Sequence, residues 1–283
     1  MIRRDWTEPL PKHNLLDLSN NVCYDQFLNH NYISNSNYPD DSKSYKLLGD
    51  YYKVNPKNIA IGYGSAELIL RIFNLFKDCT FSIVLPTWQL AEMYARELGI
   101  KIIPYPEKSD ILYIANPNGL NGTALSSSSI INLLSQYKLV IVDEAYGDFS
   151  NCSVLDSATT TSNLIVVKTL SKTVASPGLR FGYCFSNESI IKQIQDVRPG
   201  YVTTGSTLSA LEVLLPQINL HIARMIDTRN YIEEKYDVVK SQGNYVLFKT
   251  NPHLPVITKQ INGLHRMALT DLITFKEIEN EYY

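Results

Sequence analysis

The chain lacks the sequence features of a disulfide-rich, zinc-binding or membrane protein. Its four cysteines lie far apart, at positions 23, 79, 152 and 184, and form no CxxC pair, so neither a disulfide framework nor a zinc site is expected. No apolar run approaches the roughly 20 residues that span a bilayer. The first residues carry charge and proline instead of the apolar segment of a signal peptide. We therefore expect a cytoplasmic protein.

Charge of one sign is not in excess either. A formal net charge of -2 and a pI of about 6.2 give no reason to expect nucleic acid or an anionic membrane as a partner. With 283 residues, of which 45% are hydrophobic, the chain can bury a large core. This length predicts one large domain, or a large domain and a small one.

Short apolar, β-branched runs alternate with helical segments through the first two thirds of the chain. The expected strands are 58–61, 81–85, 100–103, 111–115, 139–142, 164–167 and 180–185. The expected helices between them are 43–53, 66–77, 89–98 and 126–136. Continuous apolar strands separated by helices are typical of an α/β fold, with a mostly parallel sheet covered by helices on both faces.

The two ends of the chain have a different character. Residues 1–40 are irregular and rich in Asn, Asp, Pro and Tyr, which is typical of an extended arm. After Glu188 the expected elements are the helices 190–197, 208–214 and about 221–240, the strand 245–248 and a weakly patterned tail. We predict an arm at 1–40, a large domain at 41–205 and a small α+β domain at 206–283.

Polar residues gather where the apolar strands end. Four strands are followed by the turns 62–67, 86–88, 116–122 and 143–146, and a fifth runs directly into 168–172. In open parallel sheets, ligands bind outside the carboxyl ends of the strands. We therefore expect these five turns to build a single site.

Taken one at a time, these turns leave alternatives open. The Gly64-Ser65 turn could bind a phosphate through backbone N–H groups, or could be an ordinary helix cap. Trp88 could stack on an aromatic cofactor, or could pack in the core or against another subunit. Asp143 ends a very apolar strand and needs a cation, which a protonated pyridine nitrogen could supply. A magnesium ligand or a helix cap would use the same carboxylate.

Lys172 stands in a Thr-Leu-Ser-Lys segment, eight residues before Arg180. A lysine that forms a Schiff base needs a lowered pKa, which partial burial and nearby positive charge provide. Ser171 and Arg180 suit a phosphate, as a hydroxyl donor and as a guanidinium that binds two oxygens. The alternative is an ordinary solvated lysine.

The order of three motifs resembles that of a known family. Asp143 opens Asp-Glu-Ala-Tyr, Lys172 follows 29 residues later in Thr-Leu-Ser-Lys, and Arg180 lies in Gly-Leu-Arg-Phe-Gly-Tyr. This order resembles the class I/II aminotransferases of fold type I, with histidinol-phosphate aminotransferase as the nearest branch. The likeness runs from about Asp17 to Asp271. It implies pyridoxal 5'-phosphate as the cofactor.

The resemblance also implies roles for individual residues. Lys172 would form the Schiff base and move a proton between the substrate Cα and the cofactor C4' atom. Asp143 would pair with the pyridine nitrogen, and Tyr146 would hydrogen-bond the phenolic oxygen. The other cofactor-binding residues that it implies are Gly64, Ser65, Ala66, Thr169, Ser171 and Arg180 in the turns at the phosphate, Trp88 on the ring, and Tyr38.

Further implications concern the substrate and the subunits. Tyr38 resembles the tyrosine that reaches the phosphate of the neighbouring subunit, which implies a homodimer with shared sites. Asn21 and Asn244 resemble substrate-side asparagines. Arg266 resembles the arginine that binds the α-carboxylate, or the other end of a phosphate-bearing substrate. No metal is implied.

The chain departs from the family pattern at two places. The family's Pro-Asn-Asn-Pro-Thr-Gly turn is Pro-Asn-Gly-Leu-Asn-Gly here, so Gly119 replaces the asparagine that bonds the phenolic oxygen. Asn118 could take that role if the turn shifts. Only 22 positions separate Asn244 from Arg266, which predicts a trimmed small domain, because a parallel crossover needs a dozen residues or more. The substrate pocket would then be open or completed by the partner subunit.

Three activities remain compatible with the sequence. The first is transfer of an amino group from an amino acid, or a histidinol-phosphate-like amine, to a 2-oxo acid or aldehyde. The second is decarboxylation of a phosphorylated amino acid such as threonine phosphate, and the third is cofactor binding without turnover. Nucleotide binding is disfavoured because Gly62-Tyr63-Gly64-Ser65 has no third glycine and no P-loop lysine.

Overall fold

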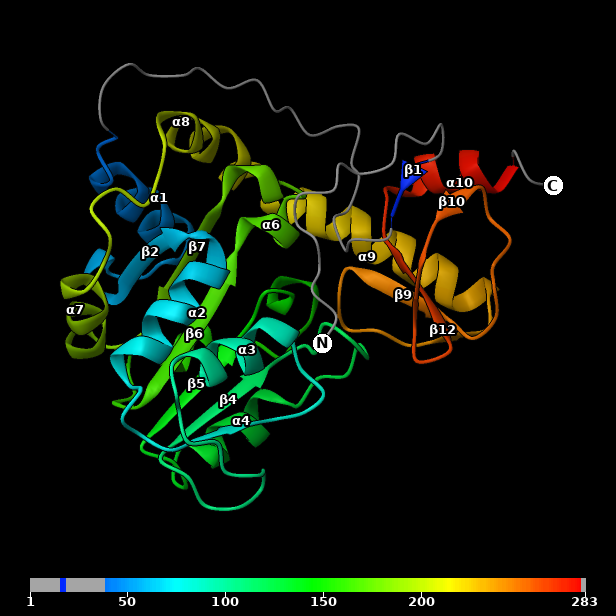
Figure 1. Ribbon diagram of the computed structural model, residues 1–283. Coiled ribbons are helices and arrows are strands. Elements are labelled where there is room, and N and C mark those ends of the chain that lie inside the picture. The colour runs from blue at the N-terminus through cyan, green and yellow to red at the C-terminus, as the bar shows by residue number, and fades with distance from the viewer. Residues whose placement is uncertain (1–15, 19–38, 281–283) are drawn as a thin grey trace.

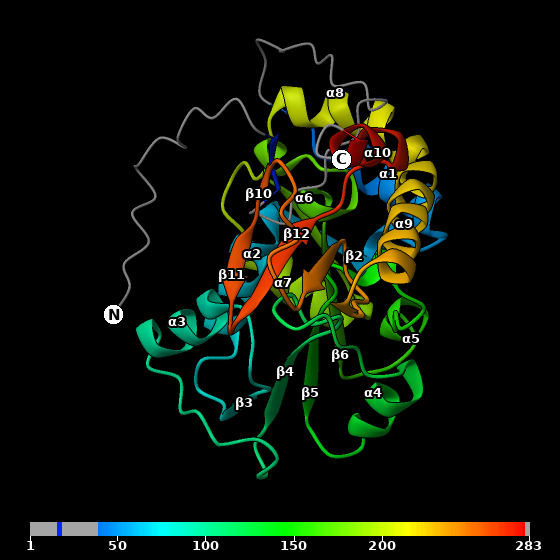
Figure 2. The same cartoon turned by 90° about the vertical axis from the view of Figure 1, so that its right-hand side faces the viewer.

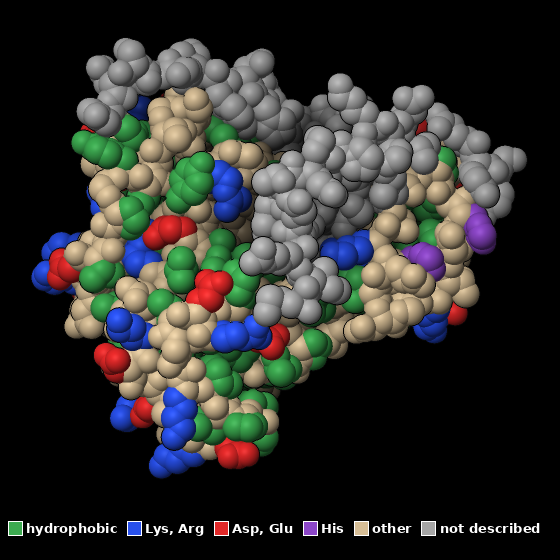
Figure 3. All heavy atoms as spheres, viewed as in Figure 1, with side chains coloured by type: hydrophobic (Ala, Val, Ile, Leu, Met, Phe, Trp, Pro, Cys, Tyr) green, Lys and Arg blue, Asp and Glu red, His purple; other side chains and the backbone are tan. Residues whose placement is uncertain are grey.

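The computed structural model describes residues 16–18 and 39–280, and the following account is confined to them. A large sheet with its helices forms one side of the molecule, and a small sheet lies on the other, with a long helix running from one to the other (Figures 1 and 2). On the face shown in Figure 3, basic and acidic side chains are interspersed, in keeping with the small net charge. No described helix is long and apolar enough to cross a membrane.

The large sheet has six strands in the order β2-β7-β6-β5-β4-β3. Its strands are β2 (Ile59–Tyr63), β3 (Phe81–Ile83), β4 (Ile111–Ala115), β5 (Leu139–Asp143), β6 (Leu164–Thr169) and β7 (Phe181–Phe185). Strands β3 to β6 are mutually parallel, and β7 is antiparallel to both β6 and β2. It follows that β2 runs in the same direction as β3 to β6.

Helices cover both faces of this sheet because its strands are apolar on both faces. Along β4, Leu112 and Ile114 belong to one core, whereas Ile111 and Tyr113 belong to the other. The first core packs against α1 (Ser42–Tyr52), α4 (Ser127–Leu133), α5 (Leu155–Ala158) and α8 (Gly205–Leu214). The second packs against α2 (Gly64–Leu75), α3 (Gln89–Glu97) and α7 (Glu188–Asp196).

The small sheet is antiparallel, with four strands in the order β11-β12-β9-β8. Its strands are β8 (Val238–Val239), β9 (Tyr245–Phe248), β11 (Lys259–Ile261) and β12 (Leu264–Ala268), and it is flanked by α9 (Ile218–Lys235) and α10 (Leu272–Asn280). A third core lies between them and includes Met225, Val246, Met267 and Phe275. Nearby, β1 (Leu16–Asp17) pairs in parallel with β10 (Val256–Ile257).

Short helical segments complete the fold. The α-helical one is α6 (Leu170–Thr173), and the 3-10 turns are η1 (Pro56–Asn58), η2 (Gly147–Phe149), η3 (Pro177–Leu179) and η4 (Leu215–Gln217). The predicted division at residues 40 and 205 stays a proposal. It is supported by the strands of the large sheet, which lie within 59–185, and those of the small sheet, which lie within 238–268.

The predicted α/β class with a mostly parallel sheet is confirmed, but some elements differ from the prediction. The expected strand 100–103 is wrong, because only Ile102 bridges Phe81, and the carbonyl of Ile103 then accepts the Ser82 hydroxyl at 3.0 Å instead of a backbone N–H of β3. The helix expected to reach residue 240 ends at Lys235, and the β-branched pair that follows joins β9 as β8. The helix expected at 126–136 ends at Leu133.

The tail after residue 248 holds more structure than its weak pattern indicated. Strands β11 and β12 form a hairpin around Asn262-Gly263, and both turn residues have positive φ angles, 48° and 81°. Asn-Gly is the residue pair that favours this kind of two-residue turn. The signal was therefore present in the sequence, between two short strands of mixed polarity.

Candidate active site

The strand directions bring the polar turns to one edge of the large sheet. Because β2 to β6 run the same way, their carboxyl ends and the turns that follow them lie at the same edge. The antiparallel strand β7 begins at this edge, so Arg180, which immediately precedes it, lies there too. Residues from six strands therefore surround one location.

Asp143 is the last residue of β5, in the middle of the sheet, and its side chain is buried. Its Oδ2 accepts a hydrogen bond from the Tyr113 hydroxyl at 2.8 Å, and its Oδ1 accepts one from the Ala145 N–H at 3.0 Å. Within residues 16–18 and 39–280, no lysine or arginine forms an ion pair with it. Burial raises the pKa of Asp143 to about 6, although the two hydrogen bonds oppose this rise.

Lys172 lies on α6, which begins directly after β6 and so turns the chain at the same edge. The hydroxyl of Thr169 caps this turn by accepting a hydrogen bond from the Ser171 N–H at 3.1 Å. Half-buried, Lys172 has its Nζ 6.0 Å from the centre of the Tyr146 ring. The lysine and the tyrosine are thus brought together from β6 and β5.

The Gly64-Ser65 turn packs directly against Arg180. Gly64 has a φ of +80°, which favours glycine, and a Cβ there would meet the end of the Arg180 guanidinium, so the two residues are in close contact. Gly182 allows a second close approach, because a Cβ on it would overlap the backbone of Gly64 and Ser65. The N–H groups that begin α2 and a guanidinium therefore lie side by side, an arrangement that suits an anion.

The turn that follows β4 closes another side of the site. A Cβ on Gly119 would lie 2.7 Å from Cε2 of Tyr146, so the ring occupies the space of the missing side chain. The Asn118 amide donates to the carbonyl of Pro86 at 2.6 Å and accepts from the N–H of Leu120 at 2.9 Å. The Asn118 side chain thereby stabilises the turn in which it lies.

Arg266 reaches this turn from the small sheet. Its side chain is buried on β12, and its Nη1 donates to the Gly119 carbonyl at 3.3 Å. Its guanidinium lies 5.6 Å from the centre of the Tyr245 ring, and the Tyr245 hydroxyl donates to the carbonyl of Asn118 at 2.8 Å. Tyr245 also packs edge-on against Tyr146, with ring centres 5.8 Å apart. The two sheets therefore meet at the predicted site.

The remaining predicted residues are placed as follows. Asn244 is fully buried immediately before β9, and its carbonyl accepts the Leu269 N–H at 3.0 Å. Trp88 precedes α3 and packs edge-on against Tyr94 at 6.1 Å. Tyr38 and Asn21 lie outside the described residues.

Besides Tyr113, which bonds Asp143, two residues near the site were not predicted. Tyr245 links Tyr146 to Arg266, and its only sequence signal is its position next to Asn244. Thr87, beside Trp88, is buried, and its hydroxyl has no hydrogen-bond partner in the described part of the chain. Its place in a strand-end turn could have drawn attention to it.

Comparison with known proteins gives consistent matches. The model of the family described as aminotransferase class I and II matches residues 30–270. A histidinol-phosphate aminotransferase of Clostridium novyi is 31% identical over 235 residues, which make up 75% of this chain and 63% of that protein. The chain thus spans less than two thirds of the length of this relative.

Solved structures show the same fold. The histidinol-phosphate aminotransferase of Clostridium acetobutylicum superposes with a TM-score of 0.77 at 20% identity, covering 95% of this chain and 98% of that one. The enzyme of the same name from Sinorhizobium meliloti, solved in complex with pyridoxal 5'-phosphate, has a TM-score of 0.73 at 16% identity. The match covers 86% of this chain and 81% of the Sinorhizobium chain.

Proposed function

The chain belongs to the aminotransferase class I and II family, and we propose that it moves an amino group between an amino acid, or a histidinol-phosphate-like amine, and a 2-oxo acid. The observation that carries the proposal is Asp143, a buried carboxylate at the centre of the strand-end site with no cation paired to it among the described residues. A buried charge of this kind calls for a positively charged partner.

Pyridoxal 5'-phosphate, the cofactor of this family, fits the residues present. Its ring nitrogen, when protonated, is a cation of the kind that Asp143 requires. Its phosphate suits the junction of Gly64 and Arg180, where backbone N–H groups and a guanidinium are adjacent. When bound, the cofactor supplies an electron sink for the bonds at the substrate Cα atom.

Three side chains would do the chemical work. Asp143, held by Tyr113 and Ala145, would keep the proton on the ring nitrogen. Lys172 would hold the cofactor through Nζ and afterwards move a proton between the substrate Cα and the cofactor C4' atom. Tyr146, close to Lys172, would donate to the phenolic oxygen. Gly119 stands in place of the family's asparagine, and Asn118 would be a second donor there if the turn shifts.

The phosphate end would be bound by groups from three elements. Arg180 would contribute a charged pair of donors, and the N–H groups of Ser65 and Ala66 would act together with the helix dipole. Ser171 would add a hydroxyl, which lies 3.1 Å from the Thr169 hydroxyl. Trp88 would cover the ring face.

Arg266 would bind the substrate α-carboxylate, or the other end of a phosphate-bearing substrate, and Asn244 would lie on the substrate side. Replacing Arg266 with glutamine should raise the KM for the amino donor by about 10- to 100-fold, which corresponds to one lost charge-assisted pair of hydrogen bonds. Cofactor affinity should stay within about threefold, because the phosphate is bound elsewhere. Steady-state kinetics measures the KM for the amino donor and the affinity for the cofactor. The matched control is Arg96→Gln, which changes an exposed arginine. An unchanged KM would refute the role of Arg266.

We also propose a homodimer in which Tyr38 of each chain reaches the partner's cofactor phosphate. The proposal rests on the resemblance of the Asn37-Tyr38-Pro39-Asp40 segment to the family pattern. Sedimentation equilibrium should give twice the 32.1 kDa mass of one chain. A single-chain mass for the cofactor-loaded protein would contradict it.

The reaction is tested by a half-reaction. The purified protein, loaded with pyridoxal 5'-phosphate and freed of excess, is mixed with glutamate, and 2-oxoglutarate is measured against protein. Formation of about one equivalent without an acceptor supports amino transfer. Failure with every amino donor tried, including histidinol phosphate, would overturn it. Release of carbon dioxide from threonine phosphate would then indicate the decarboxylase, and absence of both reactions the non-catalytic alternative.

A further inference from the structure

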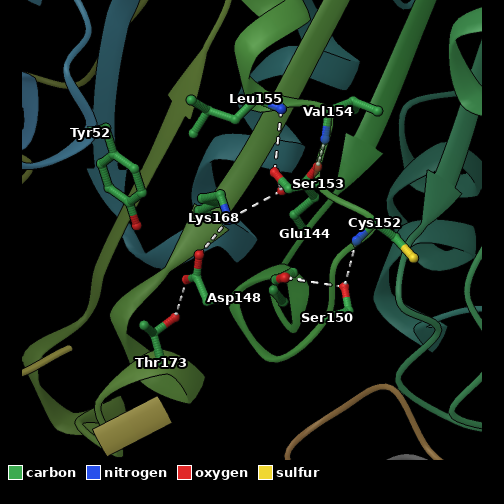
Figure 4. A network of polar contacts seen from close by, with 12 residues as sticks. Tyr52, Glu144, Asp148, Ser150, Cys152, Ser153, Val154, Leu155, Lys168 and Thr173 are labelled. Carbon is green, nitrogen blue, oxygen red and sulfur yellow. Dashed lines mark hydrogen bonds and ion pairs between the residues drawn. The ribbon is translucent and has the colours of Figure 1, made fainter. Parts of the chain in front are cut away.

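A second polar cluster lies within the large sheet, on the face of β6 that does not carry α2. Its centre is Lys168, one of the largest fully buried side chains in the described chain. Its neighbour Val167 points into the core that contains α2, whereas Lys168 points to the opposite side. Figure 4 shows Lys168 directed toward two acidic side chains from the segment after β5.

The Lys168 ammonium group forms ion pairs with two carboxylates. Its Nζ lies 2.7 Å from Oδ1 of Asp148 and 3.1 Å from Oε2 of Glu144. Burial by itself would lower the pKa of Lys168, but the two carboxylates outweigh burial and raise it, so the ammonium stays charged. The cluster is thus a buried ion-pair network.

Glu144 connects this network to the turn that carries Asp143. Its Oε2 accepts from the Ser153 hydroxyl at 2.6 Å, and its Oε1 accepts from the Val154 N–H at 2.8 Å. Its own N–H donates to the carbonyl of Val167 on β6 at 2.8 Å. Because Glu144 immediately follows Asp143, these bonds fix the end of β5.

Asp148 connects the network to the helix that carries Lys172. Its Oδ2 accepts a hydrogen bond from the Thr173 hydroxyl at 2.9 Å, and Thr173 directly follows Lys172 on α6. The Thr173 hydroxyl also lies 3.0 Å from the carbonyl of Thr169, at the start of that turn. One continuous series of contacts therefore joins Glu144, Lys168, Asp148 and Thr173.

The energetics favour a role in geometry over one in stability. Replacing a whole buried ion pair by apolar groups of similar volume is often neutral for folding, whereas removing one partner alone destabilises because it leaves a buried charge uncompensated. Lys168 and Asp148 also line a cavity of about 360 Å³, together with Tyr51, Tyr52 and Asn219. Beyond the pairing of β5 with β6, the side chains of the network connect the two turns that hold the residues of the site.

We propose that Lys168 is a positioning residue that, through Glu144 and Asp148, fixes the turn carrying Lys172 relative to the turn carrying Asp143. The inference rests on the proposed function, since it assumes that Lys172 and Asp143 act on one cofactor. Lys168 itself lies on the far side of β6 and acts through these neighbours.

The test compares three variants loaded with pyridoxal 5'-phosphate. Lys168→Met removes the charge, Lys168→Arg restores it, and Thr173→Val removes only the hydroxyl that joins α6 to Asp148. The readouts are the pH at which the visible absorption band of the loaded protein is half converted, and the dissociation constant for the cofactor. Lys192→Met, which removes an exposed ion pair with Asp196, is the matched control.

Lys168→Met and Thr173→Val should each weaken cofactor binding by about tenfold, equivalent to one lost hydrogen bond to a charged group. Both variants should also shift the half-conversion pH by about one pH unit. Lys168→Arg should restore the dissociation constant to within about threefold of wild type and the half-conversion pH to within about half a pH unit, and Lys192→Met should leave both unchanged.

If Lys168→Met does not fold, Thr173→Val decides the question. A wild-type band and affinity retained in Thr173→Val would overturn the positioning role, and so would a Lys168→Arg variant no better than Lys168→Met. A wild-type protein that shows no band at all would instead refute the proposed function.

Discussion

Replacing Asp143 with asparagine should stabilise the cofactor-free protein relative to wild type as the pH rises from 4 to 8. The reason is that the folded state of the wild-type protein holds the Asp143 proton more tightly than the unfolded chain, with a pKa of about 6 against a usual 3.8. The contribution of this carboxyl to stability is therefore present below pH 4 and is lost as the pH rises through 6.

The size of this effect follows from the pKa difference. The folded and unfolded pKa values differ by about 2 units. At about 1.36 kcal/mol for each pKa unit, this corresponds to a change of about 3 kcal/mol in the free energy of unfolding. Urea unfolding of both cofactor-free proteins at pH 4 and pH 8 measures it, with Asp78→Asn, at an exposed position, as the control. A difference between variant and wild type that stays constant with pH would show that Asp143 is not a buried, uncompensated carboxyl.

The same substitution should nearly abolish turnover. Asparagine cannot carry the negative charge that keeps the ring nitrogen protonated, so the loaded variant should lose on the order of 10²-fold or more in kcat. Single-turnover reaction with glutamate measures this loss directly. Activity within tenfold of wild type would contradict the pairing of Asp143 with the ring nitrogen.

Replacing Lys172 with alanine should cause the largest loss of activity. The variant loses both the covalent attachment and the group that moves the proton at Cα, and a loss of at least about 10³-fold is expected. The phosphate-binding residues remain, so the variant should still bind the cofactor but release it on dialysis. Lys77→Ala, at an exposed lysine, is the control and should behave as wild type.

The rate of the half-reaction with glutamate measures the effect of Lys172→Ala. A variant that retains the wild-type rate would show that another group performs the proton transfer. Addition of a primary amine such as methylamine should recover part of the rate, because the missing group is itself a primary amine.

Much of the large sheet was predictable because its strands are apolar on both faces and end in polar turns. Asp143 illustrates this, since it follows four apolar residues of β5 and lies where the pattern indicated. The direction of β7 was not predictable, because an apolar run from Phe181 to Phe185 reads the same in either direction. Its antiparallel pairing is what brings Arg180 to the same edge as Lys172.

The parts that were missed depend on contacts between distant residues. Lys168 follows four apolar residues and marked the end of a predicted strand, yet β6 continues through it, because Glu144 and Asp148 compensate its charge. The approach of Arg266 to Gly119 joins two sheets across 147 positions. No local pattern in the sequence encodes such an approach.

Chemical trapping of the cofactor tests the central claim most directly. The protein is loaded with pyridoxal 5'-phosphate, reduced with borohydride and digested, and the modified peptide is identified by mass spectrometry. The account predicts one pyridoxyl phosphate per chain, attached to Lys172. In the Lys172→Ala variant, the peptide that contains position 172 should carry none. Attachment to another lysine, or no attachment to a folded and loaded protein, would contradict it.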